Sequence, residues 1–267
     1  MDEIMEMDNK RIVLVGAGNL ATNFGKALKR GGHEIAQVYS RTEESAMTLA
    51  ELLGCGFTTD LSKLVCDADV YVVSVKDSVL DEVVGKSVRG KEQSLWLHTA
   101  GSMPMDCFKG RVARYGVLYP MQTFSKGREV DFQQIPCFVE GSDSFACEMV
   151  AALARTVSGR VIEMSSSDRK YLHLAAVWAC NFANHCYDVA SMVLGERGIP
   201  FDVMLPLIDE TARKVHELSP REAQTGPAVR YDRNVMDKHL SLMDGCRERK
   251  ELYEYISKSI HERSTGE

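Results

Sequence analysis

An apolar run that ends in closely spaced glycines is the feature that most constrains what this chain can fold into. In RIVLVGAGNLA, near the N-terminus, the run IVLV shows no alternation of apolar and polar side chains, which is typical of a strand buried on both faces of a parallel sheet. Gly16, Gly18 and Ala21 follow with the spacing of a dinucleotide-binding turn, where glycines allow a tight bend and a close approach to pyrophosphate. A glycine-rich turn of an ordinary α/β fold is the simpler alternative. The segment predicts a strand, a phosphate-binding turn and a helix over residues 19–29.

The end of the second predicted strand indicates which dinucleotide fits. The segment HEIAQVYSRT ends in Ser40, Arg41 and Thr42, whereas an NAD site would place Asp or Glu there to bond the ribose 2′-hydroxyl. A guanidinium suits a 2′-phosphate because its planar fork bonds two oxygens. Ser40 and Glu43 also have the spacing of a helix capping box, a role that is compatible with phosphate binding. These residues predict NADP(H) as the cofactor.

Three further apolar segments predict strands of the same sheet, and each ends in polar or small residues. They are VYVVSVKD, SLWLHTAGS and GVLYPMQTF. Ligands of open α/β sheets lie outside the carboxyl ends of the strands, so these ends predict the mouth of the cofactor site. Lys76 has an equally simple alternative as a solvated loop cation. The residues expected to bind the cofactor are Gly16, Ala17, Gly18, Asn19, Leu20, Ser40, Arg41, Thr42, Val75 and Lys76.

After the serine-rich stretch SGRVIEMSSSD, the sequence shows no strand alternation and takes on a helical pattern. We predict an α/β protein with an N-terminal Rossmann domain, a doubly wound parallel sheet that binds NADP over residues 1–164, and an all-helical substrate and dimerisation domain over residues 165–267. The segment AAVWACNFA is apolar all round a helix, which predicts burial against other helices or against a second subunit. A homodimer through the C-terminal helices is therefore expected. Further helices are predicted over residues 202–214, 232–244 and 248–262.

Two histidines and an asparagine are the candidate catalytic residues. His98 lies at a predicted strand end, where imidazole can exchange a proton near neutral pH. His173 and Asn181 are eight residues apart, a little over two helical turns, so they share one broad face. The alternative for His173 and Asn181 is a hydrogen-bonded core network or a dimer seam. On the functional interpretation, one histidine donates a proton and Asn181 holds a polar atom of the substrate by a hydrogen bond.

Composition excludes several classes of protein. The 267 residues carry a formal net charge of −6, whereas a nucleic-acid-binding chain normally has a basic excess. The eight cysteines form no Cys-x-x-Cys pair and no zinc-ligand spacing with histidine, so neither a metal site nor a disulfide framework is expected. The leader MDEIMEMDNK lacks an apolar core, and no apolar run reaches ~18 residues. We expect a cytoplasmic protein without nucleic-acid or membrane partners.

Almost the whole chain resembles a family of Rossmann-like NADP oxidoreductases whose helical C-terminal domain has no assigned function. The family is related to pyrroline-5-carboxylate reductase, to deazaflavin-coenzyme-dependent NADP reductases and to the 6-phosphogluconate dehydrogenase-like superfamily. The resemblance implies a reductase-type fold, a helical dimer and a cofactor between the domains. Tyr119 and Tyr231 depart from the pattern, where similar sequences often have His and Gly. The matching pieces are GAGNLA, YSRT, HTAGS, YPMQTF, residues 173–181, TGPAVRYD and His239.

The resemblance also draws attention to TGPAVRYD, which lies between predicted helices. Thr225, Arg230 and Asp232 are its candidate substrate-binding residues, with Arg230 on a substrate carboxylate and Asp232 orienting it. The alternative is that Gly-Pro marks a turn and that Asp232 is a helix N-cap.

Together these features predict an NADPH-dependent reductase that transfers a hydride to a small carbonyl or imine compound. The cofactor would carry the hydride chemistry while the protein supplies positioning and a proton. The alternative from a different class is an NADP(H)-binding sensor or regulatory protein without turnover. A further alternative is hydride exchange between NADPH and a deazaflavin.

Overall fold

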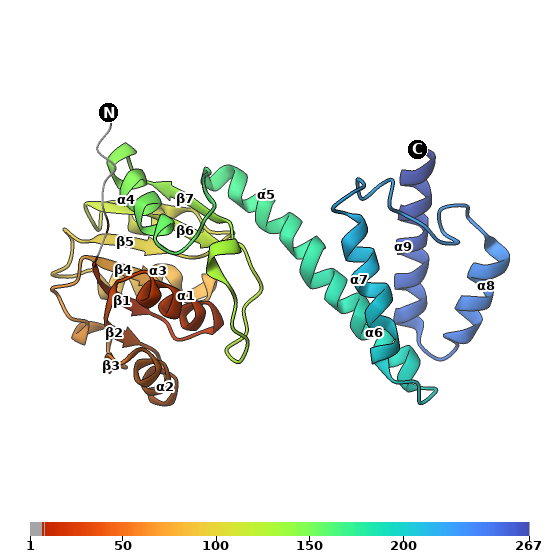
Figure 1. Cartoon of the computed structure of the whole chain (residues 1–267), viewed down its shortest axis with the longest axis horizontal. Helices are drawn as coiled ribbons and strands as arrows, with labels where there is room; N and C mark the ends of the chain where they lie inside the picture. The colour runs from red at the N-terminus through yellow and green to blue at the C-terminus, as the bar shows by residue number, and fades with distance from the viewer. Residues whose placement is uncertain (1–6, 8, 267) are drawn as a thin grey trace. The chain divides into compact units, whose positions relative to one another are not determined.

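A computed structural model gives the fold of residue 7 and residues 9–266, and its main feature is an eight-stranded sheet (Figure 1). The strand order is β3-β2-β1-β4-β5-β6-β7-β8, and every neighbouring pair is parallel except β6 and β7. The predicted Rossmann-type α/β fold is confirmed. The strands are β1 (Arg11–Val15), β2 (Glu34–Tyr39), β3 (Gly56–Thr58), β4 (Val70–Val73), β5 (Leu95–His98), β6 (Arg114–Pro120), β7 (Cys137–Gly141) and β8 (Val161–Glu163).

Helices follow the strands in the first part of the chain and replace them in the second. No described helix is both long enough and apolar enough to cross a membrane. A π-helical turn (Val177–Phe182) separates α5 from α6. The α-helices are α1 (Asn19–Arg30), α2 (Glu43–Leu53), α3 (Leu80–Ser87), α4 (Ser144–Arg155), α5 (Ser166–Ala176), α6 (Ala183–Gly195), α7 (Leu205–Lys214), α8 (Arg233–Leu242) and α9 (Arg247–Thr265).

The sheet is buried on both faces, which explains the unbroken apolar run in β1. Successive strand residues point to opposite faces. Leu14 belongs to the core layer that contains Phe24 of α1, with α2 and α4 on the same side. Val15 belongs to the opposite layer, together with Val84 of α3. Both layers exclude water, so every β1 position after Arg11 requires an apolar side chain.

The sheet departs from the all-parallel prediction at one pair. Residues 121–136 join β6 to β7 without a crossover helix, so the chain returns antiparallel to β6. α4 then supplies a crossover, and β8 pairs parallel with β7. Part of the serine-rich stretch is thus a short edge strand. Ser165, close to the predicted junction, is the N-cap of α5 and accepts a hydrogen bond from the Asp168 amide at 3.2 Å.

The chain forms two compact units, one ending at Asn181 and the other beginning at Phe182. The first unit holds the sheet and α1 to α5, and the second holds α6 to α9. The predicted division of roles between residues 1–164 and residues 165–267 stays a prediction.

The apolar helix around AAVWACNFA carries large side chains that are exposed. Leu174 is 52% exposed and Trp178 is 64% exposed, and Cys180 is exposed as well. These side chains form an apolar surface, and the prediction that other helices bury it stays a prediction. Burial against a second subunit is the alternative that stays open.

Candidate functional site

The turn after β1 forms an open cradle of backbone at the point where the strand order reverses. Gly16 has a φ of +132°, and a Cβ there would lie 2.1 Å from the carbonyl oxygen of Ser74. Only glycine fits this position, and its amide donates to the Tyr39 carbonyl at 2.8 Å. A Cβ on Gly18, in contrast, would meet no atom within 4 Å. The turn is therefore tight on its inner side and open above Gly18, as a pyrophosphate site requires.

The N-terminus of α1 meets the same open space. Gly18 is its N-cap and offers no side-chain hydrogen bond, and the first turn contains no acidic residue. The first amides of a helix lack partners within the helix and lie at the positive end of its dipole. These backbone groups fit a phosphate-bearing cofactor.

The segment that follows β2 lies next to this cradle, because Tyr39 pairs with Val15 at the strand ends. The predicted capping box of Ser40 and Glu43 is not formed, since Thr42 is the N-cap of α2 and makes no side-chain capping bond. Arg41 is exposed, and its guanidinium forms no ion pair with any described residue. A cation and two hydroxyl-bearing residues therefore stand beside the cradle, among them Ser40.

Hydrogen bonds tie together the loops after β4 and β5. The Thr99 hydroxyl donates to Ser74 Oγ at 3.2 Å, and the Ser102 hydroxyl donates to an Asp77 carboxylate oxygen. Val75 and Lys76, both predicted cofactor residues, lie in the β4 loop, with the Lys76 side chain exposed. The two loops form one continuous surface next to the cradle, because the Ser74 carbonyl lies directly against Gly16.

His98 is fully buried at the end of β5, at 0% exposure. Its Nδ1 accepts from the Ala100 amide at 3.2 Å, which leaves Nε2–H to donate to the Pro104 carbonyl at 3.1 Å. Burial, with a smaller contribution from the positive charge of Arg169, lowers the pKa of His98 to about 4. His98 is therefore neutral near pH 7 with both nitrogens engaged, which favours a role in shaping the loop over a role as proton donor.

His173, in contrast, has a side-chain partner at Nδ1, and no residue that the structure describes bonds to its Nε2. Tyr119, at the end of β6, places its hydroxyl 3.2 Å from His173 Nδ1, and the two rings meet edge to face with centroids 6.0 Å apart. A Cβ on Gly101 would come within 2.7 Å of His173 Nδ1 and 2.8 Å of Tyr119 Cζ. The β5 loop, β6 and α5 thus converge on this pair. The sequence places Tyr119 near the mouth of the cofactor site and marks it as a departure from the family pattern, but it does not predict a role for Tyr119 beside His173.

A buried ion pair anchors α5 to the sheet one turn before His173. The Arg169 guanidinium, 1% exposed, donates to Glu140 Oε2 at 2.6 Å and to the Met103 carbonyl at 2.7 Å. Burial opposes the charge of Glu140, but the hydrogen bonds from Arg169 and Ser166 leave the pKa of its carboxyl below the usual value. Arg169 and His173 share a helix face at i,i+4, so this anchor fixes where His173 lies. No motif in the sequence signals the pair, because its members are distant along the chain.

The π-helical turn changes the relation between His173 and Asn181. An α-turn holds about 3.6 residues, and a π-turn, with bonds from i to i+5, holds about one more. Eight residues that cross one turn of each kind make close to two full turns, which keeps both residues on one face as predicted. Single π-turns inside helices often occur at functional sites. Asn181 is exposed.

The substrate-binding candidates from TGPAVRYD lie in the second compact unit. Asp232 is the N-cap of α8 and accepts from the Val235 amide at 3.3 Å, so its helix-capping role is confirmed. Thr225 and Arg230 are exposed. Tyr231 has a φ of 51°, a backbone region that glycine occupies more easily, which agrees with the glycine common at this position in similar sequences.

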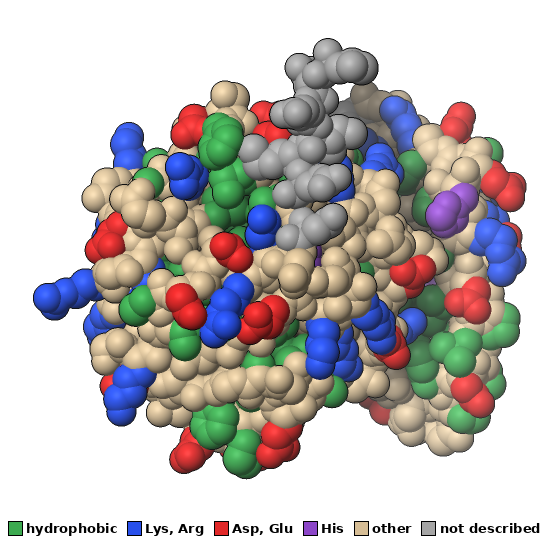
Figure 2. Space-filling view, turned by 60° about the vertical axis from the view of Figure 1, so that its left-hand side comes forward, with side chains coloured by type: hydrophobic (Ala, Val, Ile, Leu, Met, Phe, Trp, Pro, Cys, Tyr) green, Lys and Arg blue, Asp and Glu red, His purple; other side chains and the backbone are tan. Residues whose placement is uncertain are grey.

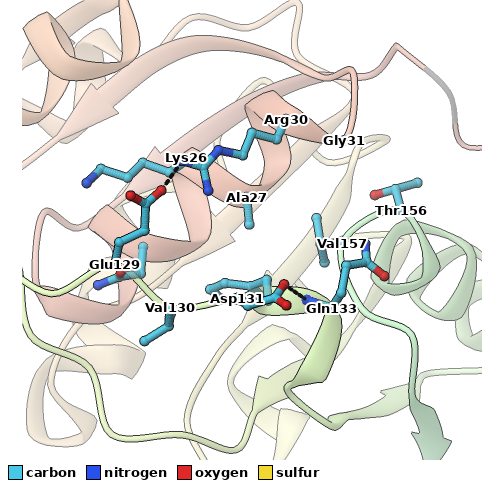
Figure 3. A pocket seen from close by; sticks show the side chains of 12 residues that line it. Lys26, Ala27, Arg30, Gly31, Glu129, Val130, Asp131, Gln133, Thr156 and Val157 are labelled. Atoms are coloured by element: carbon cyan, nitrogen blue, oxygen red, sulfur yellow. Dashed lines mark hydrogen bonds and ion pairs between the residues drawn. The ribbon is translucent and has the colours of Figure 1, made fainter.

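A cavity of about 130 Å³ lies elsewhere, beside the C-terminal half of α1 (Figure 3). Lys26 and Arg30 line one side, and Glu129 and Asp131 line the other. Arg30 pairs with Glu129, and Asp131 accepts from the Gln133 amide at 3.1 Å. The carboxylates of this cavity are already partnered, and none of the predicted site residues lines it.

The charged side chains do not gather into a region of one sign on the face shown in Figure 2, where Lys and Arg alternate with Asp and Glu. Among the described residues, no group of three or more His, Cys, Asp or Glu side chains could hold a metal ion.

Comparisons with known proteins agree with this geometry. Residues 11–97 match the family described as NADP oxidoreductase, coenzyme F420-dependent, and residues 135–260 match a domain of unknown function, DUF2520. A crystal structure of a "putative NADP oxidoreductase" from Bacteroides fragilis is 55% identical and superposes with a TM-score of 0.93 over 96% of this chain and 99% of that chain. No curated protein matches the chain.

Two more distant structures share the fold. A pyrroline-5-carboxylate reductase from Streptococcus pyogenes is 14% identical, with a TM-score of 0.63 over 95% of this chain and 98% of its own. An imine reductase from Myxococcus stipitatus in complex with NADP⁺ is 15% identical, with a TM-score of 0.62 over 96% of this chain and 93% of its own.

The fold, the glycine-rich cradle and the family matches define a Rossmann-type NADP oxidoreductase class. Within that class, the chain belongs to the family of the Bacteroides fragilis protein. In this chain the oxidoreductase domain is joined to DUF2520.

Proposed function

We propose that the protein is an NADPH-dependent reductase of a small carbonyl or imine compound. The observation that carries the proposal is a pair of hydrogen-bonded loops that extends from the open glycine cradle to a histidine whose Nε2 bonds to no described residue. The cradle supplies room for phosphate at Gly18, and the loops end at His173 beside Tyr119. The imine reductase with bound NADP⁺ and the pyrroline-5-carboxylate reductase share the fold, which supports a small C=N or C=O substrate.

Backbone groups of residues 16–20 would hold the cofactor pyrophosphate, and Ser40, Arg41 and Thr42 would hold the 2′-phosphate. Val75 and Lys76 would border the cofactor from the β4 loop. Bound NADPH supplies a hydride, which reduces the substrate carbon as NADPH becomes NADP⁺. The open space at Gly18, the uncapped start of α1 and the unpaired Arg41 support this assignment.

On the substrate side, His173 gives the proton from Nε2 to the substrate nitrogen or oxygen while the adjacent carbon receives the hydride. Asn181 bonds the polar atom of the substrate from the same helix face. Arg230 binds a substrate carboxylate, with Thr225 and Asp232 nearby in sequence. His98 keeps the β5 loop in place, because both of its nitrogens are bonded to backbone.

Hydride exchange with a deazaflavin is a second candidate, favoured by the coenzyme F420 dependence in the description of the N-terminal family. Purified protein supplied with NADPH and with either oxidised F420 or the cyclic imine 1-pyrroline separates the two. Our proposal expects NADPH oxidation with the imine and none with F420.

Changing Arg41 to Asp is expected to weaken NADPH binding roughly ten- to a hundredfold while leaving NADH binding nearly unchanged. A hydrogen bond to a charged group contributes about 1.5–3 kcal/mol, and the new carboxylate would also repel the 2′-phosphate. Calorimetric titration of both cofactors measures the ratio. Arg89→Asp is the matched control, because Arg89 is exposed and lies before β5, at the opposite edge of the sheet. Equal loss in both variants would remove Arg41 from the cofactor site.

We also propose a homodimer formed through the apolar surface of α5 and the π-turn. Tyr171, Leu174 and Trp178 are large, exposed and spaced along one helix at three and four residues. Sedimentation should give twice the 29.7 kDa mass of one chain, and Leu174→Glu with Trp178→Glu should give the mass of a single chain. Met47→Glu, at an exposed position of α2, should leave the dimer intact. A wild-type chain that sediments as a monomer at micromolar concentration contradicts this proposal.

A further inference from the structure

We infer that Tyr119 is the residue that keeps a proton on Nε2 of His173, and therefore that it positions the proton used in reduction. The inference rests on the proposed function for the use of that proton, but the assignment of the tautomer rests on the geometry alone.

The first step is that the Tyr119 hydroxyl needs a hydrogen-bond acceptor. Tyr119 is 9% exposed, and within the described chain its hydroxyl has one hydrogen-bond partner, His173 Nδ1 at 3.2 Å. Burial raises the pKa of Tyr119, so the hydroxyl keeps its hydrogen near neutral pH. A buried O–H requires an acceptor. Nδ1 must then be the acceptor, and the proton of the neutral ring lies on Nε2.

The second step concerns the protonated ring. An imidazolium donates from both nitrogens, whereas a tyrosine hydroxyl can either donate or accept. When His173 takes up a second proton, the Tyr119 hydroxyl can rotate and accept from Nδ1–H. Tyr119 is therefore a partner for Nδ1 in both charge states, and Nε2 carries a proton in both. The proton that leaves goes from Nε2 of the imidazolium to the substrate nitrogen or oxygen. The neutral ring left behind holds its remaining proton on Nδ1, which donates to the Tyr119 hydroxyl until solvent returns a proton to Nε2.

The third step is that the pair is held in place before any ligand arrives. Gly101 lets the two rings lie against the β5 loop, because a side chain there would overlap both of them. Arg169 fixes the preceding turn of α5 through Glu140 and the Met103 carbonyl. Tyr119 itself is held by β6, where its neighbours include Phe138 at a centroid distance of 6.5 Å.

The test is nitrogen NMR of the full chain labelled with ¹⁵N-histidine, for wild type and for Tyr119→Phe. We expect wild-type His173 to show Nε2–H and a hydrogen-bonded Nδ1. In Tyr119→Phe, which keeps the ring contact with Phe138, the Nδ1 signal should move to that of an unbonded nitrogen and the two tautomers should mix. Tyr119→His retains a donor at this position and should restore much of the wild-type signal. His98 also carries its proton on Nε2, but backbone groups fix that tautomer. Its signals should therefore be identical in all three proteins.

Turnover supplies the second readout, with 1-pyrroline as the probe. Tyr119→Phe should lower kcat roughly tenfold with little change in KM or in NADPH affinity, and Tyr119→His should recover part of the loss. A wild-type spectrum with the proton on Nδ1, or a His173 spectrum that Tyr119→Phe leaves unchanged, would overturn the inference. Wild-type protein that fails to oxidise NADPH would contradict the proposed function instead, since the NMR result decides the tautomer without turnover.

Discussion

Replacing Arg169 with Met is expected to lower the free energy of unfolding by about 3–5 kcal/mol. The guanidinium is 1% exposed and the Glu140 side chain is 15% exposed, so the substitution leaves a carboxylate with little water and without its cation. Removing one partner of a buried pair costs far more than the pair itself contributes. Urea denaturation at pH 7, followed by circular dichroism, measures the loss.

A control and a double variant separate this effect from a general loss of charge. Arg155→Met breaks the exposed pair of Arg155 with Glu148 and should cost at most about 1 kcal/mol. Adding Glu140→Leu to Arg169→Met removes the stranded carboxylate and should recover a large part of the stability. If Arg169→Met and Arg155→Met cost the same, the ion pair is not the anchor of α5.

His173→Ala is expected to lower the rate of NADPH-dependent reduction about 10²- to 10⁴-fold, the usual contribution of a positioned acid. The cofactor cradle does not contain His173, so NADPH affinity should stay within about twofold of wild type. Steady-state assays with 1-pyrroline, together with calorimetry, measure the two quantities. His185→Ala is a matched control, because His185 is an exposed histidine of the neighbouring helix α6.

His98→Ala should act differently, chiefly by destabilising the protein, because His98 is buried and bonded to the backbone at both nitrogens. If both His98→Ala and His173→Ala leave the reduction intact, neither histidine is the acid.

The sequence predicted the elements whose local pattern matches their environment. The unbroken run in β1, the glycines after it and the start of α1 all follow from burial on two faces and from a tight turn. The short strands β3 and β8 were not predicted, because three residues carry too little periodicity to distinguish a strand from a loop. The antiparallel direction of β7 depends on the loop before it, and the residues of the strand carry no pattern that predicts this direction.

The residues of the candidate site likewise divide into those that a local sequence pattern predicts and those that only the fold brings together. The cradle residues are contiguous in sequence and were predicted as a group, whereas Tyr119 and His173 are 54 residues apart and meet only through the fold. Arg169 and Glu140 are likewise 29 residues apart. The π-turn between His173 and Asn181 could not be predicted from a periodicity of 3.6 residues, because it is a departure from that periodicity.

The measurement that tests the central claim most directly is calorimetric titration of the purified wild-type protein with NADPH and with NADH. Saturable binding of NADPH, tighter than that of NADH, is the result expected from an open cradle at Gly18 beside an unpaired Arg41. Binding of neither nucleotide would mean that the turn from Gly16 to Gly18 serves the fold alone, and it would contradict the proposed reductase.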